Sequence, residues 1–306
     1  MPEGHTVHRL AGALDRAFTG TIVAASSPQG RFVEGAALLD GAEVEQAWAW
    51  GKHLFVDFVH ERVLHVHLGL VGRLDVTRFA AAATDGAAAA TTTQVGEPAP
   101  PAPTVRLRLV NRTHMADLRA MSVVDIITPE QAAQIIARLG PDPLRAGQLG
   151  NDPQRSLARL GGTGRSIAEL LLDQSVIAGV GNLYRAEVLH RNRVDPFTPG
   201  RRVRPSTWLA IWEDLVALMA VGVAFGQIIT LPVQVERAQA MITQAVIAQA
   251  GQQRDGGTAY DFPTFPREFA VYGQTGMPCP TCGCQVRSRR LAGRTLYWCG
   301  RCQRRH

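Results

Sequence analysis

Apolar residues near the start of the chain recur with the period of a helix. Val7, Leu10 and Leu14 follow the i, i+3, i+7 spacing that places side chains on one helical face. This pattern predicts an amphipathic helix over residues 3–18. Glu3 would begin that helix, where the helix dipole favours a carboxylate.

From Gly20 to about Ile127 the pattern becomes short and strand-like. Six segments are rich in β-branched and aromatic residues, and several alternate between apolar and polar positions: 21–27, 42–50, 52–59, 62–69, 104–110 and 121–127. They predict an all-β sandwich or barrel packed on the first helix. Residues 80–104 interrupt the pattern with an Ala/Thr/Pro-rich, low-complexity stretch, which is expected to be a disordered loop between strands.

A helical pattern replaces the strand pattern from Thr128 onward. Residues 128–140 begin with a capping threonine and a proline in the first turn, and they end at a glycine. Residues 204–226 predict a further amphipathic helix. Residues 226–262 are partly glutamine-rich and give no interpretable pattern.

Between these helices lies a glycine-rich turn. An apolar helix is expected to end near Val176, and Asn182 is expected to cap a new helix over Leu183–His190. In the turn, Gly179 and Gly181 would let the backbone approach a ligand closely, and the helix N-terminus would attract phosphate. An ordinary turn between two helices is the alternative interpretation.

Length and composition indicate a globular protein. With 306 residues and 46% hydrophobic content, the chain can bury a core, and two or more domains are expected. We see no run long enough to span a bilayer and no signal peptide, so a cytoplasmic protein without a membrane partner is expected. The net charge of +6 favours a polyanionic partner, nucleic acid before an anionic membrane.

The basic residues are unevenly distributed. Residues 279–306 contain seven arginines and no acidic residue, for which a solvated tail is the alternative interpretation. Lys52 is the only lysine among 32 basic residues. Because lysine can be tuned to give and take a proton whereas arginine stays protonated, Lys52 is a candidate catalytic residue.

Two Cys-x2-Cys pairs lie near the C-terminus. Cys279 and Cys282 are followed, after sixteen intervening residues, by Cys299 and Cys302. Four thiolates at this spacing match a tetrahedral structural site, so one structural Zn²⁺ is predicted. Two disulfides are the alternative, which conflicts with the missing signal peptide. Cys284 is interpreted as a spare thiol.

The residues between the two cysteine pairs predict a hairpin. Two short strands would meet at Ala292-Gly293, with Arg294 at or next to the tip. A metal-pinned hairpin with an arginine at its tip is suited to contact a phosphate.

The first residues offer a nucleophile. Removal of Met1 would make Pro2 an N-terminal secondary amine. An α-amino group titrates near pKa ~8, against ~10.4 for a lysine side chain, so a usable fraction is uncharged at neutral pH. Such an amine can attack a carbonyl-like carbon and form an iminium, with the carboxylate of Glu3 in reach. An ordinary protein start is the alternative.

Residues 65–73 read as a strand that runs into a glycine-rich turn. His67 could hydrogen-bond a phosphate, and Leu70 could present an apolar wedge. Each residue alone is a weak indication of function.

Together, these motifs resemble the formamidopyrimidine-DNA glycosylase / endonuclease VIII family. The resemblance covers most of the chain: the Pro-Glu start, "WGKHLF", "HLG", "LLDQSVIAGVGNLYRAEVL" as the helix–two-turn–helix, and "VYGQTGMPCPTCG…GRTLYWCGRCQ" as the zinc finger. The "MPEG" start and the "YWC" segment are more similar to the endonuclease VIII branch. The implied fold is α+β and multidomain: an N-terminal helix plus β-sandwich (1–127), a helix–two-turn–helix domain (128–262) and a zinc finger (263–306).

The resemblance implies a bifunctional DNA glycosylase and abasic-site lyase of base-excision repair. Pro2 would attack C1′ of the damaged nucleotide, flipped out of the duplex, and form a Schiff base as the base leaves. Glu3 would be the proton donor and shuttle. Lys52 would contact phosphate and serve in β-elimination, and Arg294 would hold phosphate and assist δ-elimination.

The same resemblance implies His67 and Asn182 as further phosphate contacts. The partner would be double-stranded damaged DNA, bound by a monomer associated with the nucleoid.

Some residues depart from the formamidopyrimidine branch. Leu70 stands at the position of an apolar void-filling residue, but residues 110–123 lack the accompanying Arg-Phe pair. Thr6 stands where those relatives often carry Glu. Oxidised pyrimidines are the expected substrates. Bulky or crosslinked lesions are an alternative within the family, and a non-catalytic zinc-ribbon DNA-binding protein is the alternative outside it.

Overall fold

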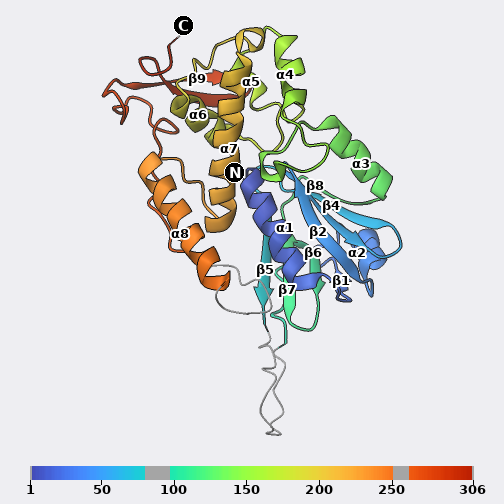
Figure 1. Ribbon diagram of the computed structural model, residues 1–306. Coiled ribbons are helices and arrows are strands. Elements are labelled where there is room, and N and C mark those ends of the chain that lie inside the picture. Colours follow the sequence, from blue (N-terminus) through green and yellow to red (C-terminus); the bar gives the residue numbers. More distant parts are fainter. Residues whose placement is uncertain (1, 80–96, 251–261, 305–306) are drawn as a thin grey trace. The chain divides into compact units, whose positions relative to one another are not determined.

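The computed structural model describes residues 2–79, 97–250 and 262–304 (Figure 1). Contacts divide the chain into two compact units. The first contains Met1–Pro2 and Val7–Ile135, and the second contains Glu3–Thr6 and Ile136–His306. The N-terminal helix α1 (Gly4–Phe18) therefore begins in the second unit and continues into the first.

The first unit contains two four-stranded antiparallel sheets. One sheet has the order β2-β3-β4-β8, formed by Val44–Trp50, His53–Phe58, Arg62–His67 and Val123–Ile127. The other has the order β1-β6-β7-β5, formed by Ala24–Ser26, Val105–Val110, His114–Arg119 and Arg73–Arg78. One buried cluster takes side chains from α1 (Leu14), the first sheet (Val56) and the second sheet (Leu107). The predicted β-sandwich packed on the first helix is confirmed.

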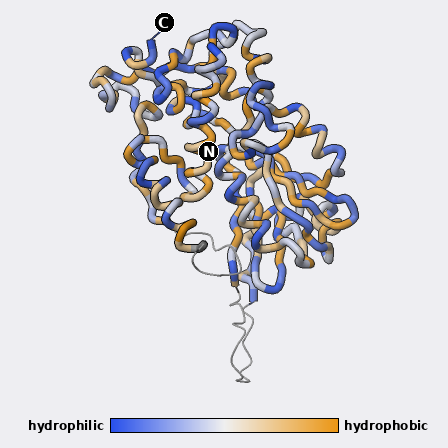
Figure 2. Tube along the Cα trace, in the orientation of Figure 1, coloured by the Kyte–Doolittle hydropathy of each residue, from blue (hydrophilic) through white to orange (hydrophobic). Residues whose placement is uncertain are grey.

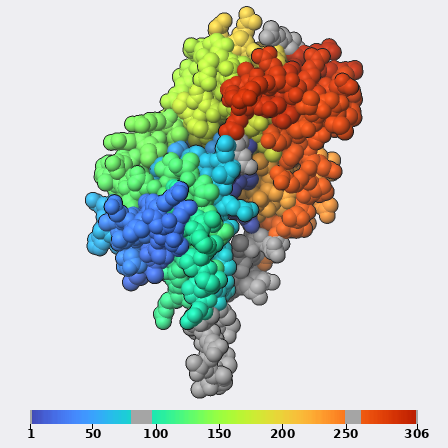
Figure 3. All heavy atoms as spheres, turned by 180° about the vertical axis from the view of Figure 1, so that it is seen from behind, coloured from blue at the N-terminus to red at the C-terminus, as the bar shows by residue number. Residues whose placement is uncertain are grey.

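Three elements of this unit escaped the sequence analysis. They are strands β5 and β7 and the short helix α2 (Val33–Leu39), which lies at the surface of the unit (Figure 3). In β7 the alternation is hidden because a charged residue occupies a buried position. Asp117 is buried and forms an ion pair with Arg108 of β6 at 2.6 Å. Residues 80–96 of the expected loop lie outside the described residues, and 97–104 contain neither helix nor strand.

The second unit is mainly helical. After α3 (Pro129–Arg138), which ends just inside it, come η1 (Pro143–Arg145), α4 (Gln154–Gly161), α5 (Ile167–Leu170), α6 (Asn182–Arg191), η2 (Gly200–Arg202), α7 (Pro205–Phe225) and α8 (Pro232–Ala250). Strands β9 (Val286–Leu291) and β10 (Arg294–Cys299) form an antiparallel hairpin. The predicted helical domain and cysteine-bearing hairpin are confirmed as parts of the fold.

Helix α7 forms the centre of the second unit's core. Trp208, Leu215 and Met219 are buried in a cluster with Tyr184 and Val188 of α6. Hydrophobic residues dominate the second half of α7 (Figure 2). By length and composition this helix could cross a membrane, so the expectation that no run was long enough is wrong. Half of its most apolar window is buried, which is the environment of a core helix.

Other helix boundaries differ from those expected. Helix α5 ends at Leu170, well before Val176, because turns replace the helix from Leu171 onward. Helix α8 occupies much of the segment that gave no interpretable pattern. Its low amphipathicity explains why the spacing of apolar residues did not reveal it.

Candidate active site and metal centre

Glu3 lies buried against the beginning of α6. Its carboxylate accepts hydrogen bonds from the backbone N–H groups of Gly181 (2.9 Å), Leu183 (2.8 Å) and, at a longer 3.4 Å, Tyr184. The first N–H groups of a helix have no partner within it, and the helix dipole favours a negative charge there. Glu3 therefore caps α6, although it is only 2% exposed and lies 178 residues before Gly181 in the chain.

This capping corrects the sequence-based interpretation of the glycine-rich turn. Asn182 does not cap α6, because it is the first helical residue and Gly181 holds the N-cap position. A Cβ atom at Gly181 would lie 2.4 Å from Cδ of Glu3, and one at Gly4 would lie 2.8 Å from Cα of Gly179. The close approach that these glycines permit is thus made by the chain's own first residues, and a carboxylate occupies the helix end where phosphate was expected.

Pro2 immediately precedes this buried carboxylate. Pro2 is half-buried and belongs to the first unit, whereas Glu3 belongs to the second. The N–H of Gly4 donates to the carbonyl oxygen of Gly179 at 2.8 Å, so the backbone that follows Glu3 is also fixed next to α6. The role of Pro2 as nucleophile stays a prediction.

Asn182 belongs to a buried network that joins α6 to the hairpin. Its Nδ2 donates to the carbonyl oxygen of Thr295 at 3.0 Å, and its Oδ1 accepts from Arg185. Arg185 also donates to Thr295 O at 3.3 Å and is fully buried. These contacts fix the orientation of the Asn182 amide and leave its second N–H without a partner in this network. Its predicted phosphate contact is untested.

Arg185 keeps its charge inside the second unit. Burial lowers the pKa of Arg185 from 12.5 to about 10, the carboxylate of Glu3 opposes this shift, and the charge of Arg294 adds to it. The guanidinium therefore stays protonated at neutral pH. The sequence offered one signal for it: Arg185 follows Asn182 at the i, i+3 spacing that brings two side chains together on a helix.

Arg294 is exposed and begins β10 next to the hairpin tip. The two turn residues, Ala292 and Gly293, have φ values of 50° and 72°. Two positive values are the geometry of a type I′ turn, whose twist matches that of the flanking strands. Arg294 pairs with Leu291 across the ladder. The predicted hairpin is confirmed, and the role of Arg294 in DNA binding stays a prediction.

Four cysteines form the candidate metal centre. The Sγ atoms of Cys279, Cys282, Cys299 and Cys302 all lie within 4.8 Å of one another. The sulfurs of Cys282 and Cys299 are 3.4 Å apart, and those of Cys279 and Cys302 are 3.9 Å apart. Four Zn–S bonds of ~2.3 Å in a tetrahedron place the sulfurs roughly 3.8 Å apart, so these residues fit such an ion. Cys284 is not part of this group.

A second buried carboxylate supports this centre. Glu187 of α6 accepts hydrogen bonds from the N–H groups of residues 270–272 at 2.9–3.0 Å and from the hydroxyl of Thr230 at 2.9 Å. The segment that leads to Cys279 is thereby attached to α6. His190, from the same helix, places Nε2 3.3 Å from Sγ of Cys279. Glu187 and His190 were not among the residues predicted from the sequence.

In the first unit, Lys52 lies in a two-residue turn between β2 and β3. Trp50 and His53 are the pair that flanks this turn. Of the two turn residues only Gly51 has a positive φ, at 59°, which is the pattern of a type II′ turn. The turn therefore fixes the backbone of the half-buried Lys52 at the end of the sheet.

His67 ends β4 at the same end of the sheet. The N–H of Gly69 donates to its Nδ1 at 3.1 Å, and Oγ of Ser122 lies 2.9 Å from the same atom. Because Nδ1 accepts, the hydrogen-bond network assigns the proton of the neutral ring to Nε2. Burial, and then the charge of Lys52, lower the pKa of His67 below 6.5. At neutral pH the ring thus offers a neutral N–H donor.

Leu70 and Val71 lie in the turn after β4. They are 54% and 72% exposed, so two apolar side chains project next to His67 in the sequence. This exposure suits the predicted wedge, which stays a prediction.

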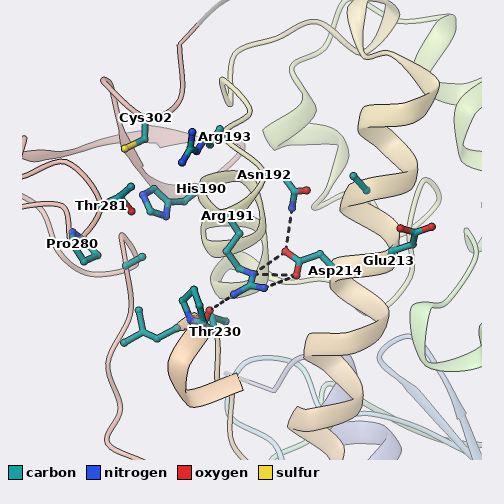
Figure 4. A pocket seen from close by; sticks show the side chains of 14 residues that line it. His190, Arg191, Asn192, Arg193, Glu213, Asp214, Thr230, Pro280, Thr281 and Cys302 are labelled. Atoms are coloured by element: carbon teal, nitrogen blue, oxygen red, sulfur yellow. Dashed lines mark hydrogen bonds and ion pairs between the residues drawn. The ribbon is translucent and has the colours of Figure 1, made fainter. Parts of the chain in front are cut away.

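A cavity of about 700 Å³ lies elsewhere in the second unit (Figure 4). Of the predicted site residues, only Cys302 lines it. Its central arginine, Arg191, is engaged by Asp214 at 2.8 Å and by the carbonyl oxygen of Thr230 at 2.7 Å. The predicted catalytic residues do not meet in this cavity.

Known proteins resemble the whole chain. Two family models match: Formamidopyrimidine-DNA glycosylase N-terminal domain over residues 1–124 and Formamidopyrimidine-DNA glycosylase H2TH domain over residues 139–233. The chain is 42% identical to Endonuclease 8 1 of Mycobacterium tuberculosis over 303 residues, covering 99% of this chain and 100% of the relative. It is 31% identical to a formamidopyrimidine-DNA glycosylase of Thermomicrobium roseum, covering 84% and 80%.

Solved structures share the fold. A Lactococcus lactis formamidopyrimidine-DNA glycosylase bound non-covalently to DNA containing an AP site has a TM-score of 0.70 at 18% identity. The same enzyme in complex with DNA containing an oxidised pyrimidine has a TM-score of 0.71 at 19% identity. Each comparison covers 99% of this chain and 100% of the other, and likeness at this identity shows the fold.

Proposed function

This chain belongs to the formamidopyrimidine-DNA glycosylase / endonuclease VIII family, and on that premise we propose that it excises oxidised bases from double-stranded DNA and cuts the strand at the abasic site. The observation that carries this proposal is the burial of Glu3 on the N-terminus of α6, one residue after Pro2. A non-catalytic DNA-binding protein has no need of a carboxylate held beside the amine that removal of Met1 would expose at Pro2.

The proposed chemistry begins with proton transfer at the N-terminus. Hydrogen bonds from backbone N–H groups favour the ionised form of a carboxylate. Glu3 therefore starts as the anion, takes the proton of the Pro2 ammonium, and gives it to the departing base. The freed amine bonds to C1′ as the base leaves with the glycosidic electron pair. The C1′–O4′ bond then opens, the remaining N–H proton of Pro2 passes through Glu3 to O4′, and an iminium remains between Pro2 and the opened sugar.

The iminium then makes strand cleavage possible. Loss of a C2′ proton to a nearby base eliminates the 3′ phosphate, and Lys52 is the proposed residue for this step because its amine can be deprotonated. Arg294 holds phosphate and assists a second elimination. His67 and Asn182 provide neutral donors to phosphate oxygens, and Leu70 fills the space left by the flipped nucleotide.

A single structural Zn²⁺ held by Cys279, Cys282, Cys299 and Cys302 would fix the hairpin that carries Arg294. Zinc binding supplies the folding energy of such small modules. The ion has no part in the chemical steps above.

Oxidised pyrimidines are the proposed substrates. Support comes from the 42% identity with a protein named Endonuclease 8 1, compared with 27–32% for proteins named formamidopyrimidine-DNA glycosylase. Bulky or crosslinked lesions remain the second candidate in the same family. The monomeric state and the cytoplasmic, nucleoid-associated location stay predictions.

Borohydride trapping tests the proposal. Incubation with a lesion-containing duplex and borohydride should reduce the iminium and leave a covalent protein–DNA adduct. Pro2→Gly is the matched variant, because it should bind DNA through phosphate contacts elsewhere but lose most base excision. Wild-type trapping yield from Pro2→Gly would overturn the Schiff-base assignment. A panel of oxidised pyrimidine, oxidised purine and crosslinked duplexes then ranks the substrates.

A further inference from the structure

One face of the sheet β2-β3-β4-β8 carries a row of stacked rings. The ladder places Phe55 opposite both Trp48 and His65. Ring centroids are 4.4 Å apart for Trp48 and Phe55, 5.0 Å for Phe55 and His65, and 5.2 Å for His65 and His53. Alternate residues of the same strands, such as Leu54, point to the opposite face, where they join the hydrophobic core.

The row ends at His67. His53 is the direct cross-strand partner of His67, and its ring meets the His67 ring edge-on, with centroids 5.0 Å apart and planes at 63°. Diagonally across the same two strands, Nδ1 of His53 lies 2.9 Å from Nε2 of His65. His65 is only 6% exposed, so this hydrogen bond offsets the cost of burying its imidazole.

Both rings of the hydrogen-bonded pair are neutral. Burial lowers the pKa of His53 to about 3, with smaller contributions from the charges of His67, His65 and Lys52. Burial, and then the charge of His67, lower the pKa of His65 to about 4, which Asp125 opposes. At neutral pH one proton is shared between the two facing nitrogens, and the pair adds no charge beside Lys52.

We propose that His53 and His65 are positioning residues that aim the Nε2–H of His67 at a DNA phosphate. The proposal deepens, and rests on, the proposed function of His67 as a phosphate contact. His65 fixes the rotation of the His53 ring through their hydrogen bond. The His53 ring limits the rotation of the His67 ring from one side, while Gly69 and Ser122 hold its Nδ1 from the other.

The consequence is a donor that is oriented before DNA arrives. Fixing a side chain in its bound orientation improves affinity because less rotational freedom is lost on binding. Two histidines that only satisfy each other in the protein interior would not have this effect. The positioning role and a purely structural role differ in one respect. Only in the positioning role does the contribution of His65 to DNA binding depend on the presence of His67.

A double-mutant cycle measures that dependence. His65→Phe keeps a ring in the stack but removes the hydrogen bond to His53. His65→Gln places an amide near the position of Nε2 and should preserve it. Phe55→Leu is the matched control, since it disturbs the same stack without touching the hydrogen bond. The full-length protein is titrated with a duplex that contains a tetrahydrofuran abasic analogue, and single-turnover nicking is measured on a lesion duplex.

We expect His65→Phe to weaken binding and slow nicking by roughly tenfold, the scale of one hydrogen bond to a charged group. His65→Gln and Phe55→Leu should stay within about twofold of the unmodified protein. In a His67→Ala background, His65→Phe should cause no further loss. An equal loss in both backgrounds, or equal activity of His65→Phe and His65→Gln, would overturn the positioning role.

A spectroscopic measurement separates this proposal from the proposed function. Imidazole ¹⁵N shifts of His67 report its tautomer and mobility without DNA. His65→Phe should broaden or shift the His67 resonances, whereas Phe55→Leu should not. Normal binding by His67→Ala would defeat its assignment as a phosphate contact, and the ¹⁵N spectra would then decide the positioning of the ring alone. Unchanged His67 resonances in His65→Phe would contradict the positioning itself.

Discussion

The beginning of α6 and the turn end of the sheet β2-β3-β4-β8 hold polar groups in opposite ways. At α6, backbone N–H groups favour a negative charge on the buried Glu3. The buried Arg185 stays protonated, because carbonyl groups and the Glu3 carboxylate oppose the effect of burial. At the sheet end, burial keeps His53, His65 and His67 neutral beside Lys52.

The difference follows from what each element offers to a charge. A helix end presents unpaired N–H groups that are already oriented, so they stabilise an anion without rearrangement. Stacked rings on a sheet face do little to stabilise a charge, and burial there disfavours the charged form of a histidine. The first setting suits a carboxylate that is ionised at the start of the proposed reaction. The second suits neutral donors and a lysine that can release its proton.

Metal removal should have the largest effect of the predicted changes. It should disrupt the second unit and leave the first unit intact. The four-cysteine cluster lies in the second unit. Chelation, or Cys299→Ser, should abolish DNA binding, since metal binding supplies the folding energy of small modules of this kind. Metal analysis should give one zinc per chain, and a gel-shift assay should show the loss of binding. A metal-free protein that still binds and cuts DNA would contradict this assignment.

Glu3→Gln tests whether the α6 end needs a charge. Base excision should fall by ~10³, within the usual contribution of general acid–base catalysis. Cleavage of a pre-formed abasic site should survive better, because no base has to leave. Base release and nicking are followed separately under single-turnover conditions. Glu187→Gln is the matched control on the same helix, and it should lower thermal stability without separating the two activities. Equal survival of both activities in Glu3→Gln would exclude the proton role.

Lys52→Arg tests whether the positively charged residue at the sheet end must be able to lose its proton. Arginine preserves the positive charge but does not deprotonate in proteins. Nicking should fall by ~100-fold, with a smaller loss of base removal and nearly unchanged, salt-dependent binding. The reverse exchange, Arg294→Lys, is the matched comparison and should cost less than tenfold if that residue acts mainly through its charge. Near-normal nicking by Lys52→Arg would reduce Lys52 to a phosphate contact.

Acidification should lower the stability of the folded protein, because burial disfavours a charge on two histidines at the sheet end. The folded pKa values of His53 and His65, about 3 and about 4, lie below the ordinary 6.5. The unfolded chain therefore binds these protons first. Stability should be independent of them above pH ~6.5 and should fall below it by roughly 1 kcal/mol per pH unit for each ring. Urea denaturation at pH 7.5 and pH 5 measures the slope, which should be shallower in His65→Phe. An identical slope in that variant would show that other groups dominate.

Local sequence signals predicted the elements that have strong hydrophobic periodicity or clear turn residues. The spacing of Val7, Leu10 and Leu14 predicted α1, and Ala292-Gly293 predicted the β9–β10 hairpin. The Cys-x2-Cys spacing predicted the cysteine cluster. Strand β7 escaped because its buried Asp117 depends on Arg108 of a neighbouring strand, a pairing that no local pattern reveals.

The candidate site shows the same limit. The residue types at Pro2, Glu3 and Lys52 are visible in the sequence, but their surroundings depend on contacts between distant segments. The cap of α6 was assigned to Asn182 because a cap is normally adjacent in sequence, whereas Glu3 provides it from the chain's start. The hydrogen bond between His53 and His65 likewise follows from strand register, which the alternation of residues does not fix alone.

Gly179 and Gly181 give the Glu3 cap a consequence for mutational tolerance. Neither residue carries a functional group, yet a methyl group at position 181 would collide with the Glu3 carboxylate, and Gly179 has a φ of 91° that disfavours other residues. In a saturation-mutagenesis survey scored by repair in living cells, both positions should reject alanine as strictly as position 3 rejects glutamine. A map of intolerant positions would therefore mark two glycines as though they took part in the reaction.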